Sequence, residues 1–74
     1  MLSEDDRALL DLEACGWVHE GTKLGAIGWR LDLRPAAYYQ RLNALLDDPA
    51  ALEYAPALIY RLRERRERAR RGHA

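Results

Sequence analysis

The chain has 74 residues, with twelve Lys and Arg side chains, twelve Asp and Glu side chains and a single cysteine. A chain of this length forms one domain with a small core, and one cysteine excludes an intramolecular disulfide and suits a reducing cytoplasm. The zero net charge hides an asymmetry, because residues 1–20 carry a net charge of −5 and residues 55–74 one of +5. No apolar run approaches membrane-spanning length, so we predict a cytoplasmic protein without membrane contact. The local basic segment says more about the partners of the protein than its net charge does.

The first predicted helix starts at Ser3 and reaches about Glu20, where Gly21 can cap its end. Ser3 and Asp6 have the spacing of a capping box, in which each side chain accepts a hydrogen bond from the other residue's backbone N–H. The acidic first turn suits the positive end of the helix dipole. These features predict one acidic helix at the N-terminus.

The second predicted helix runs from Thr22, as its N-cap, to about Leu31. Gly25 and Gly28 lower its intrinsic helix propensity by roughly 1 kcal/mol each, so the helix depends on tertiary packing. We expect these glycines to let a neighbouring helix approach closely, and we expect Trp29 to be half-buried.

A tight turn and a third helix follow. Asp32 occupies a position that requires a left-handed residue, which Asp tolerates better than most residues do. Leu33 is the apolar plug of the turn, and Pro35 fits the first position of the third helix, which reaches about Leu46. At spacings of four and three residues, the apolar stripe of this helix consists of Tyr38, Leu42 and Leu45.

The rest of the chain divides into a short turn and a long basic helix. Asp48 caps a turn over Pro49 to Glu53, and Pro56 begins the fourth predicted helix. The apolar anchors of that helix are Leu58, Ile59 and Leu62. Residues 63–74 have no apolar face, so we predict a basic helical extension or tail beyond a domain of residues 1–62.

The stretch from Ile27 to Leu42 resembles the signature of the helix-turn-helix motif. Its positions are filled by Ile27, Gly28, Leu31, Leu33, Tyr38 and Leu42. Asp32 stands where the motif usually has Gly, and Tyr38 where it usually has Val or Ile. In that motif the second helix enters the major groove of DNA, with its N-terminal residues against base edges. We therefore predict an all-α fold, a four-helix domain with a central helix-turn-helix and an Arg-rich C-terminal helix; the alternative is a helical bundle whose hairpin does not bind DNA.

A wider resemblance covers most of the chain. It rests on Leu2-Ser3-Glu4, Tyr38-Tyr39-Gln40, Leu42-Asn43-Ala44-Leu45, Asp48-Pro49 and the Arg-rich end. These segments look like a family of short actinobacterial proteins of unknown function. The resemblance implies a small helix-turn-helix protein, and it carries no established activity.

The candidate DNA-binding residues lie off the apolar stripe of the third helix. They are Arg34, Ala36, Tyr39, Gln40 and Asn43. Gln and Asn can pair with adenine, Arg can pair with guanine or bind phosphate, and a small Ala can contact a thymine methyl. Lys23, near the start of the second helix, is a further candidate, for a phosphate contact. The alternative is a solvated polar face.

The basic segment allows two interpretations. Arg63, Arg66 and Arg70 are candidate phosphate contacts, because cationic side chains bind nucleic acid electrostatically. Alternatively the segment is a solvated helix end, in which Glu64 with Arg68 and Glu67 with Arg71 form i,i+4 pairs.

Nothing in the sequence predicts an enzyme, a cofactor or a metal site. Cys15 and His19 lie four residues apart, which is half of a zinc site, but no second pair exists. We therefore expect a packed thiol and an ordinary histidine.

The predicted function is sequence-specific binding of double-stranded DNA by a small transcriptional regulator. One helix-turn-helix covers only a half-site, so we expect a homodimer, with the fourth predicted helix as the dimer element. The alternative is a protein-interaction adaptor that docks on the transcription machinery, on RNA polymerase or a regulator protein. The acidic N-terminus favours the adaptor, because acids on the binding face would repel DNA.

Overall fold

The structure is a computed structural model that describes residues 1–72, and every regular element within them is a helix. The elements are α1 (Glu4–Glu13), α2 (Glu20–Leu31), α3 (Pro35–Leu45), α4 (Pro49–Tyr54) and α5 (Pro56–Gly72). The predicted all-α fold is confirmed, but the described chain has five helices where the sequence predicted four. The predicted extension is helical as far as Gly72, and positions 73 and 74 lie outside the described residues.

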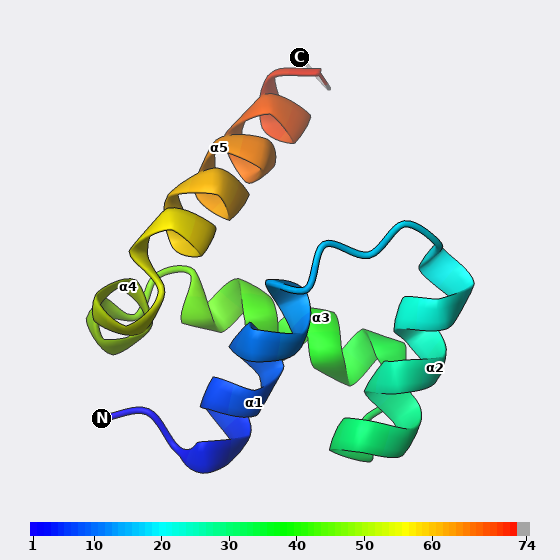
Figure 1. Ribbon diagram of the computed structural model, residues 1–74. Helices are drawn as coiled ribbons and strands as arrows, with labels where there is room; N and C mark the ends of the chain where they lie inside the picture. The colour runs from blue at the N-terminus through cyan, green and yellow to red at the C-terminus, as the bar shows by residue number, and fades with distance from the viewer. Residues whose placement is uncertain (73–74) are drawn as a thin grey trace.

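Helices α1, α2 and α3 pack against one another, and α4 and α5 pack together beside them (Figure 1). Helix α5 rises from α4, and its C-terminal half extends beyond the other helices (Figure 1). Within residues 1–72, no helix is both long and apolar enough to cross a membrane.

The start of α1 agrees with the sequence and its end does not. The Ser3 hydroxyl accepts from the Asp6 backbone N–H at 3.0 Å, and the Asp6 carboxylate accepts from the Ser3 N–H, so the capping box is confirmed. The helix ends at Glu13 instead of Glu20, because Gly16 has a left-handed backbone with φ of 69°. The Trp17 indole N–H then donates to a carbonyl of α1, that of Leu12, at 2.7 Å and folds the chain back over the helix end.

The new end of α1 moves several residues off the first helix. Cys15 and His19 do not share a helix, since His19 is the N-cap of α2. The expected packed thiol is also wrong, because Cys15 is exposed and its thiol donates to the Asp11 carbonyl at 3.3 Å. Helix α2 starts at Glu20, ahead of the predicted cap at Thr22.

Helix α2 ends as predicted, but within residues 1–72 no neighbouring helix packs against its outer face. Asp32 is left-handed, with φ of 53° and ψ of 41°, which confirms the tight turn. The expected approach of a helix to the glycines is wrong, because a Cβ at Gly25 or Gly28 would meet no atom within 4 Å. Trp29 is 74% exposed instead of half-buried, since it lies on this same open side.

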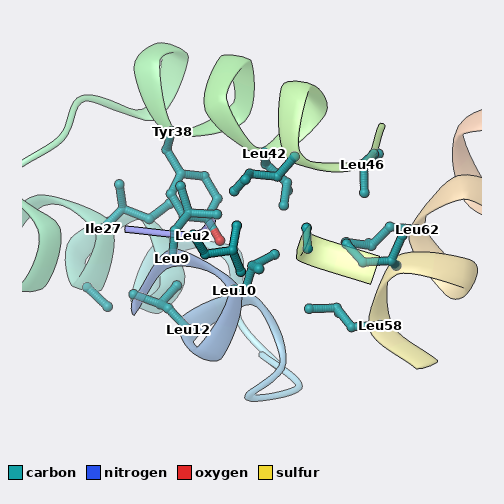
Figure 2. Packing of buried hydrophobic residues seen from close by; sticks show 14 residues of the cluster. Leu2, Leu9, Leu10, Leu12, Ile27, Tyr38, Leu42, Leu46, Leu58 and Leu62 are labelled. Carbon is teal, nitrogen blue, oxygen red and sulfur yellow. The ribbon is translucent and has the colours of Figure 1, made fainter. Parts of the chain in front are cut away.

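The core joins all five helices. Tyr38 and Leu42 of α3 are buried as predicted and lie against the apolar residues of α1 and α2 (Figure 2). The fourteen buried apolar residues are Leu2, Leu9, Leu10, Leu12, Ala26, Ile27, Tyr38, Leu42, Leu45, Leu46, Ala51, Leu58, Ile59 and Leu62. The predicted apolar anchors of α5 are thus confirmed. The predicted turn after Asp48 is α4, capped by the Asp48 carboxylate, which accepts from the Ala50 N–H at 2.9 Å.

Candidate nucleic-acid interface

The packing of α3 decides which of its residues face outward. Tyr38, Leu42 and Leu45 point to the core, and α1 packs against that buried side. The opposite side of α3 therefore presents exposed residues, among them Ala36, Gln40 and Asn43, with Arg34 exposed at its N-cap and Tyr39 on its flank. Five of the six residues predicted for DNA binding thus lie on or beside one exposed helix face.

Tyr39 is held at the edge of this face. Its hydroxyl donates to the Glu20 carboxylate at 3.2 Å, and its ring stands edge-on to Tyr38 with centroids 5.0 Å apart. The Lys23 ammonium lies 5.1 Å from the Tyr39 ring centroid, within the range of a cation–π interaction. The Tyr39 donor is therefore already used inside the protein, and a phosphate contact by Tyr39 would compete with Glu20.

Lys23 is largely buried and paired within the protein. Only 8% of the residue is exposed, and its ammonium lies 2.8 Å from the Glu13 carboxylate. The Tyr38 hydroxyl donates to the same Glu13 oxygen at 2.5 Å. One carboxylate of α1 thus joins α2 and α3. Lys23 also lines a pocket with Arg61 and Arg65, so the predicted phosphate contact by Lys23 stays a prediction, and it would compete with the ion pair to Glu13.

The two donors to Glu13 have shifted pKa values. Burial raises the pKa of the Tyr38 hydroxyl above its ordinary value of 10.0, and the hydrogen bond to Glu13 raises it further. Burial lowers the pKa of Lys23, but the hydrogen bond and the charge of Glu13, with help from Tyr39, raise it more. Lys23 therefore stays charged and Tyr38 stays protonated at neutral pH, so both keep donating to Glu13.

Two of the three arginines predicted to contact phosphate, Arg63 and Arg66, lie at the C-terminal end of α3. The Arg63 Nε donates to the Leu46 carbonyl at 2.6 Å. The Arg66 guanidinium donates to both oxygens of Asp47, at 3.0 and 3.2 Å, and to the Asn43 side-chain oxygen at 3.3 Å. Hydrogen bonds from Arg66, followed by its charge and those of Arg63 and Arg70, hold the pKa of Asp47 below its ordinary value.

The arginines of the basic segment differ in whether they have a partner within the protein. Arg63 caps the end of α3 and Arg66 ties α5 to it, so neither guanidinium is wholly free. The i,i+4 pairs expected in α5 are present, with Arg68 2.7 Å from Glu64 and Arg71 3.8 Å from Glu67. Among residues 56–72 the arginines with no intramolecular ion pair or hydrogen bond are Arg61, Arg65 and Arg70.

Arg61 and Arg65 were not among the site residues predicted from the sequence. They line a pocket of about 330 Å³ between α5 and the N-terminal end of α2, which also includes Glu20. Their spacing of four residues, next to the buried Leu62, is the signal that could have placed them together on one flank of α5.

No cluster of metal ligands lies in the part of the chain that the structure describes. Within it, no three His, Cys, Asp or Glu side chains come close enough to hold a metal ion.

A protein-family model described as "Protein of unknown function (DUF3263)" matches residues 1–73. The chain belongs to this family. The comparison confirms the resemblance to a family of unknown function. No curated protein and no solved structure matches the chain. Membership of DUF3263 implies no particular activity. The geometry of α3 and its surroundings is therefore the basis for a functional proposal.

Proposed function

We propose that the protein binds double-stranded DNA sequence-specifically through the outward face of α3, as a small helix-turn-helix regulator of transcription. The observation that carries the proposal is the exposure of Arg34, Ala36, Gln40 and Asn43 on a helix that a left-handed Asp32 sets off from α2. An α-helix fits the major groove, and Arg, Gln and Asn are the side chains that pair with base edges there.

The acids of α1 do not oppose this proposal. Helix α1 packs on the buried side of α3, away from the face that would meet DNA. Several of its carboxylates are also engaged within the protein, Asp6 with Arg41 at 3.1 Å and Asp11 with the Tyr54 hydroxyl at 2.8 Å. The acidic N-terminus therefore favours the adaptor less than the sequence alone indicated.

The proposed phosphate contacts come from α5. Arg61, Arg65 and Arg70 have no partner within the described part of α5 and can neutralise phosphates without first breaking an ion pair. The charge of Arg70, with those of Arg66 and Arg63, helps to lower the pKa of Asp47. We keep Arg63 and Arg66 as residues that hold α5 beside α3.

A homodimer remains part of the proposal, because one motif reads a half-site. Helix α5 is the proposed dimer element, and Tyr60, which is 60% exposed on it, is a candidate contact.

The test is a titration of duplex DNA at several salt concentrations. Arg34→Ala should weaken binding to the best site about tenfold, since a good base contact is worth about 1–3 kcal/mol. Arg7→Ala makes the same change of charge on exposed α1 and should leave binding nearly unaltered. Gln40→Ala should reduce the preference for the best site more than it reduces non-specific binding. A folded protein that binds no duplex at low salt would refute the proposal.

The second candidate is a protein-interaction adaptor on the transcription machinery. The observation that favours it is the exposed Trp29, whose ring has the Arg30 guanidinium 5.0 Å from its centroid. Aromatic and Arg side chains are enriched in protein interfaces. The adaptor is favoured if the unaltered protein binds RNA polymerase or a regulator protein but no duplex DNA. Trp29→Ala should then lose the binding to that protein.

A further inference from the structure

The guanidinium of Arg66 is fixed across the end of α3. It reaches both oxygens of Asp47, the two-pronged pairing in which a planar guanidinium loses its freedom to rotate. Only 25% of the Arg66 side chain is exposed. Arg66 also donates to the side-chain oxygen of Asn43, which lies one helical turn before Asp47. Asn43 is therefore in contact with a fixed group.

The chemistry of arginine decides which way the Asn43 amide faces. A guanidinium carries five N–H donors and no acceptor, whereas an amide has an acceptor oxygen at one corner and two donors at the other. Arg66 can pair only with the oxygen, so the NH₂ group of Asn43 is turned away from it. The side chain thus turns its donors away from Arg66, and its oxygen is turned toward Arg66, to which one of its lone pairs is committed.

An asparagine held this way cannot read adenine as an unconstrained asparagine does. Recognition of adenine uses both halves of the amide, because the oxygen accepts from N6 and the nitrogen donates to N7. Guanine offers two acceptors, O6 and N7, on the same edge, which suits an amide that presents donors. With adenine, the N6 amino group would face the Asn43 NH₂ group, donor against donor.

We infer that Arg66 is a positioning residue that orients Asn43 to favour guanine over adenine at the base that Asn43 meets. This inference rests on the proposed DNA binding and adds to it a determinant of specificity on α5, outside the helix-turn-helix. Asp47 is part of the same positioning contact, because its carboxylate holds the Arg66 guanidinium that orients the Asn43 amide.

The experiment is selection of binding sites from randomised duplexes, followed by competition between duplexes that differ at one base pair. The unaltered protein should prefer guanine at one position, and Asn43→Ala should abolish the preference there. In Arg66→Ala the freed amide can turn, and the preference should move toward adenine by about tenfold, the discrimination of one good two-pronged contact.

Arg65→Ala is the matched control, because it removes the same charge from the adjacent residue of α5 and leaves Asn43 untouched. It should weaken binding to all sequences alike and keep the preference for guanine. A merely structural or electrostatic role of Arg66 would give the same pattern as Arg65→Ala. Circular dichroism would check that each variant is helical.

The outcomes separate this inference from the proposed function. If the protein selects a site through α3 but Arg66→Ala keeps the preference for guanine, the inference fails and the proposed function stands. A preference for adenine in the unaltered protein also overturns the inference. If the folded protein binds no duplex, the proposed function fails, and the inference fails with it.

Discussion

At the scale of single residues, the Glu13 carboxylate of α1 joins α1 to α2 and α3. Lys23 and Tyr38 both donate to its Oε1, at 2.8 and 2.5 Å, and the Glu13 side chain lies in the interior with Lys23. Removing one member of a buried ion pair costs about 3–5 kcal/mol, because the remaining charge keeps its desolvation penalty. Glu13, Lys23 and Tyr38 therefore fix the position of α3 relative to α1 and α2.

The sequence could predict part of this group. Tyr38 lies on the apolar stripe of α3, so its burial follows from spacing. Lys23 lies four residues before the buried Ile27 and so shares its helix face, but a lysine is almost always found at the surface unless paired. Its partner Glu13 is the last residue of α1, and this helix end, followed by the turn at Gly16, was not predicted from the sequence.

The raised pKa of Tyr38 predicts how stability depends on alkaline pH. Above pH 10.0 the tyrosine of the unfolded chain ionises, while the folded one, with its raised pKa, keeps its proton. The stabilisation is complete below the unfolded pKa and is lost as pH rises above it. Unfolding free energy should therefore fall more steeply in the unaltered protein than in Tyr38→Phe, by about 1.4 kcal/mol per pH unit.

Urea unfolding between about pH 8 and about pH 11 would measure this difference, because this range spans the ordinary pKa of 10.0 at which the tyrosine of the unfolded chain ionises. Tyr60→Phe is the control, since Tyr60 is 60% exposed and should leave the slope unaltered. At neutral pH, Tyr38→Phe should cost about 1–2 kcal/mol, because Glu13 loses one donor. Equal slopes in the unaltered protein and Tyr38→Phe would contradict the raised pKa.

At the scale of elements, existence and order of the helices follow from the sequence better than their ends. The caps at Ser3 and Asp48, the left-handed Asp32 and the prolines at the starts of α3 and α5 are local signals, and the structure agrees with each. The end of α1 was missed, because helical spacing of apolar residues continues to Trp17. In the structure, Trp17 instead packs on the core from a loop.

The open face of α2 leads to a prediction about its glycines. At Gly25 the backbone is helical and an added Cβ meets nothing within 4 Å, so Gly25→Ala should raise the unfolding free energy by about 0.5–1 kcal/mol. Gly16 is equally open but left-handed, with φ of 69°, so Gly16→Ala should lower it by about 1 kcal/mol. Chemical denaturation measures both. Destabilisation by Gly25→Ala would show that α2 packs differently.

At the scale of the whole molecule, the two charged ends do not neutralise each other. Three of the five acids of α1 are engaged with α2, α3 and α4: Glu13 with Lys23, Asp6 with Arg41 and Asp11 with Tyr54. Within residues 56–72, the ion-paired arginines are held by Asp47, Glu64 and Glu67. The sequence showed the asymmetry of charge but could not show these partners, because they depend on how distant helices pack.

The basic end of α5 can therefore be tested by removing it. Residues 64–72 contribute nothing to the buried core, and their ion pairs are largely exposed, so deletion of residues 64–74 should leave the melting temperature nearly unchanged. If the arginines bind phosphate, the deletion lowers affinity for duplexes of every sequence, in addition to the change of base preference expected from the loss of Arg66. It also flattens the dependence of log K on log salt by about 0.9 for each phosphate that the shortened protein no longer neutralises.

A full-length variant separates charge from helix length in that experiment. Replacing Arg61 and Arg65 by Gln removes two arginines that have no ion pair within residues 1–72, and it keeps α5 whole. If both bind phosphate, the salt slope should fall by about 2, and the preference among sequences should be retained, because phosphate binding carries no base information. A solvated helix end would instead leave affinity and slope unaltered in both variants. A deletion that lowers the melting temperature markedly and leaves DNA affinity intact would assign α5 a structural role, and the phosphate role would be wrong.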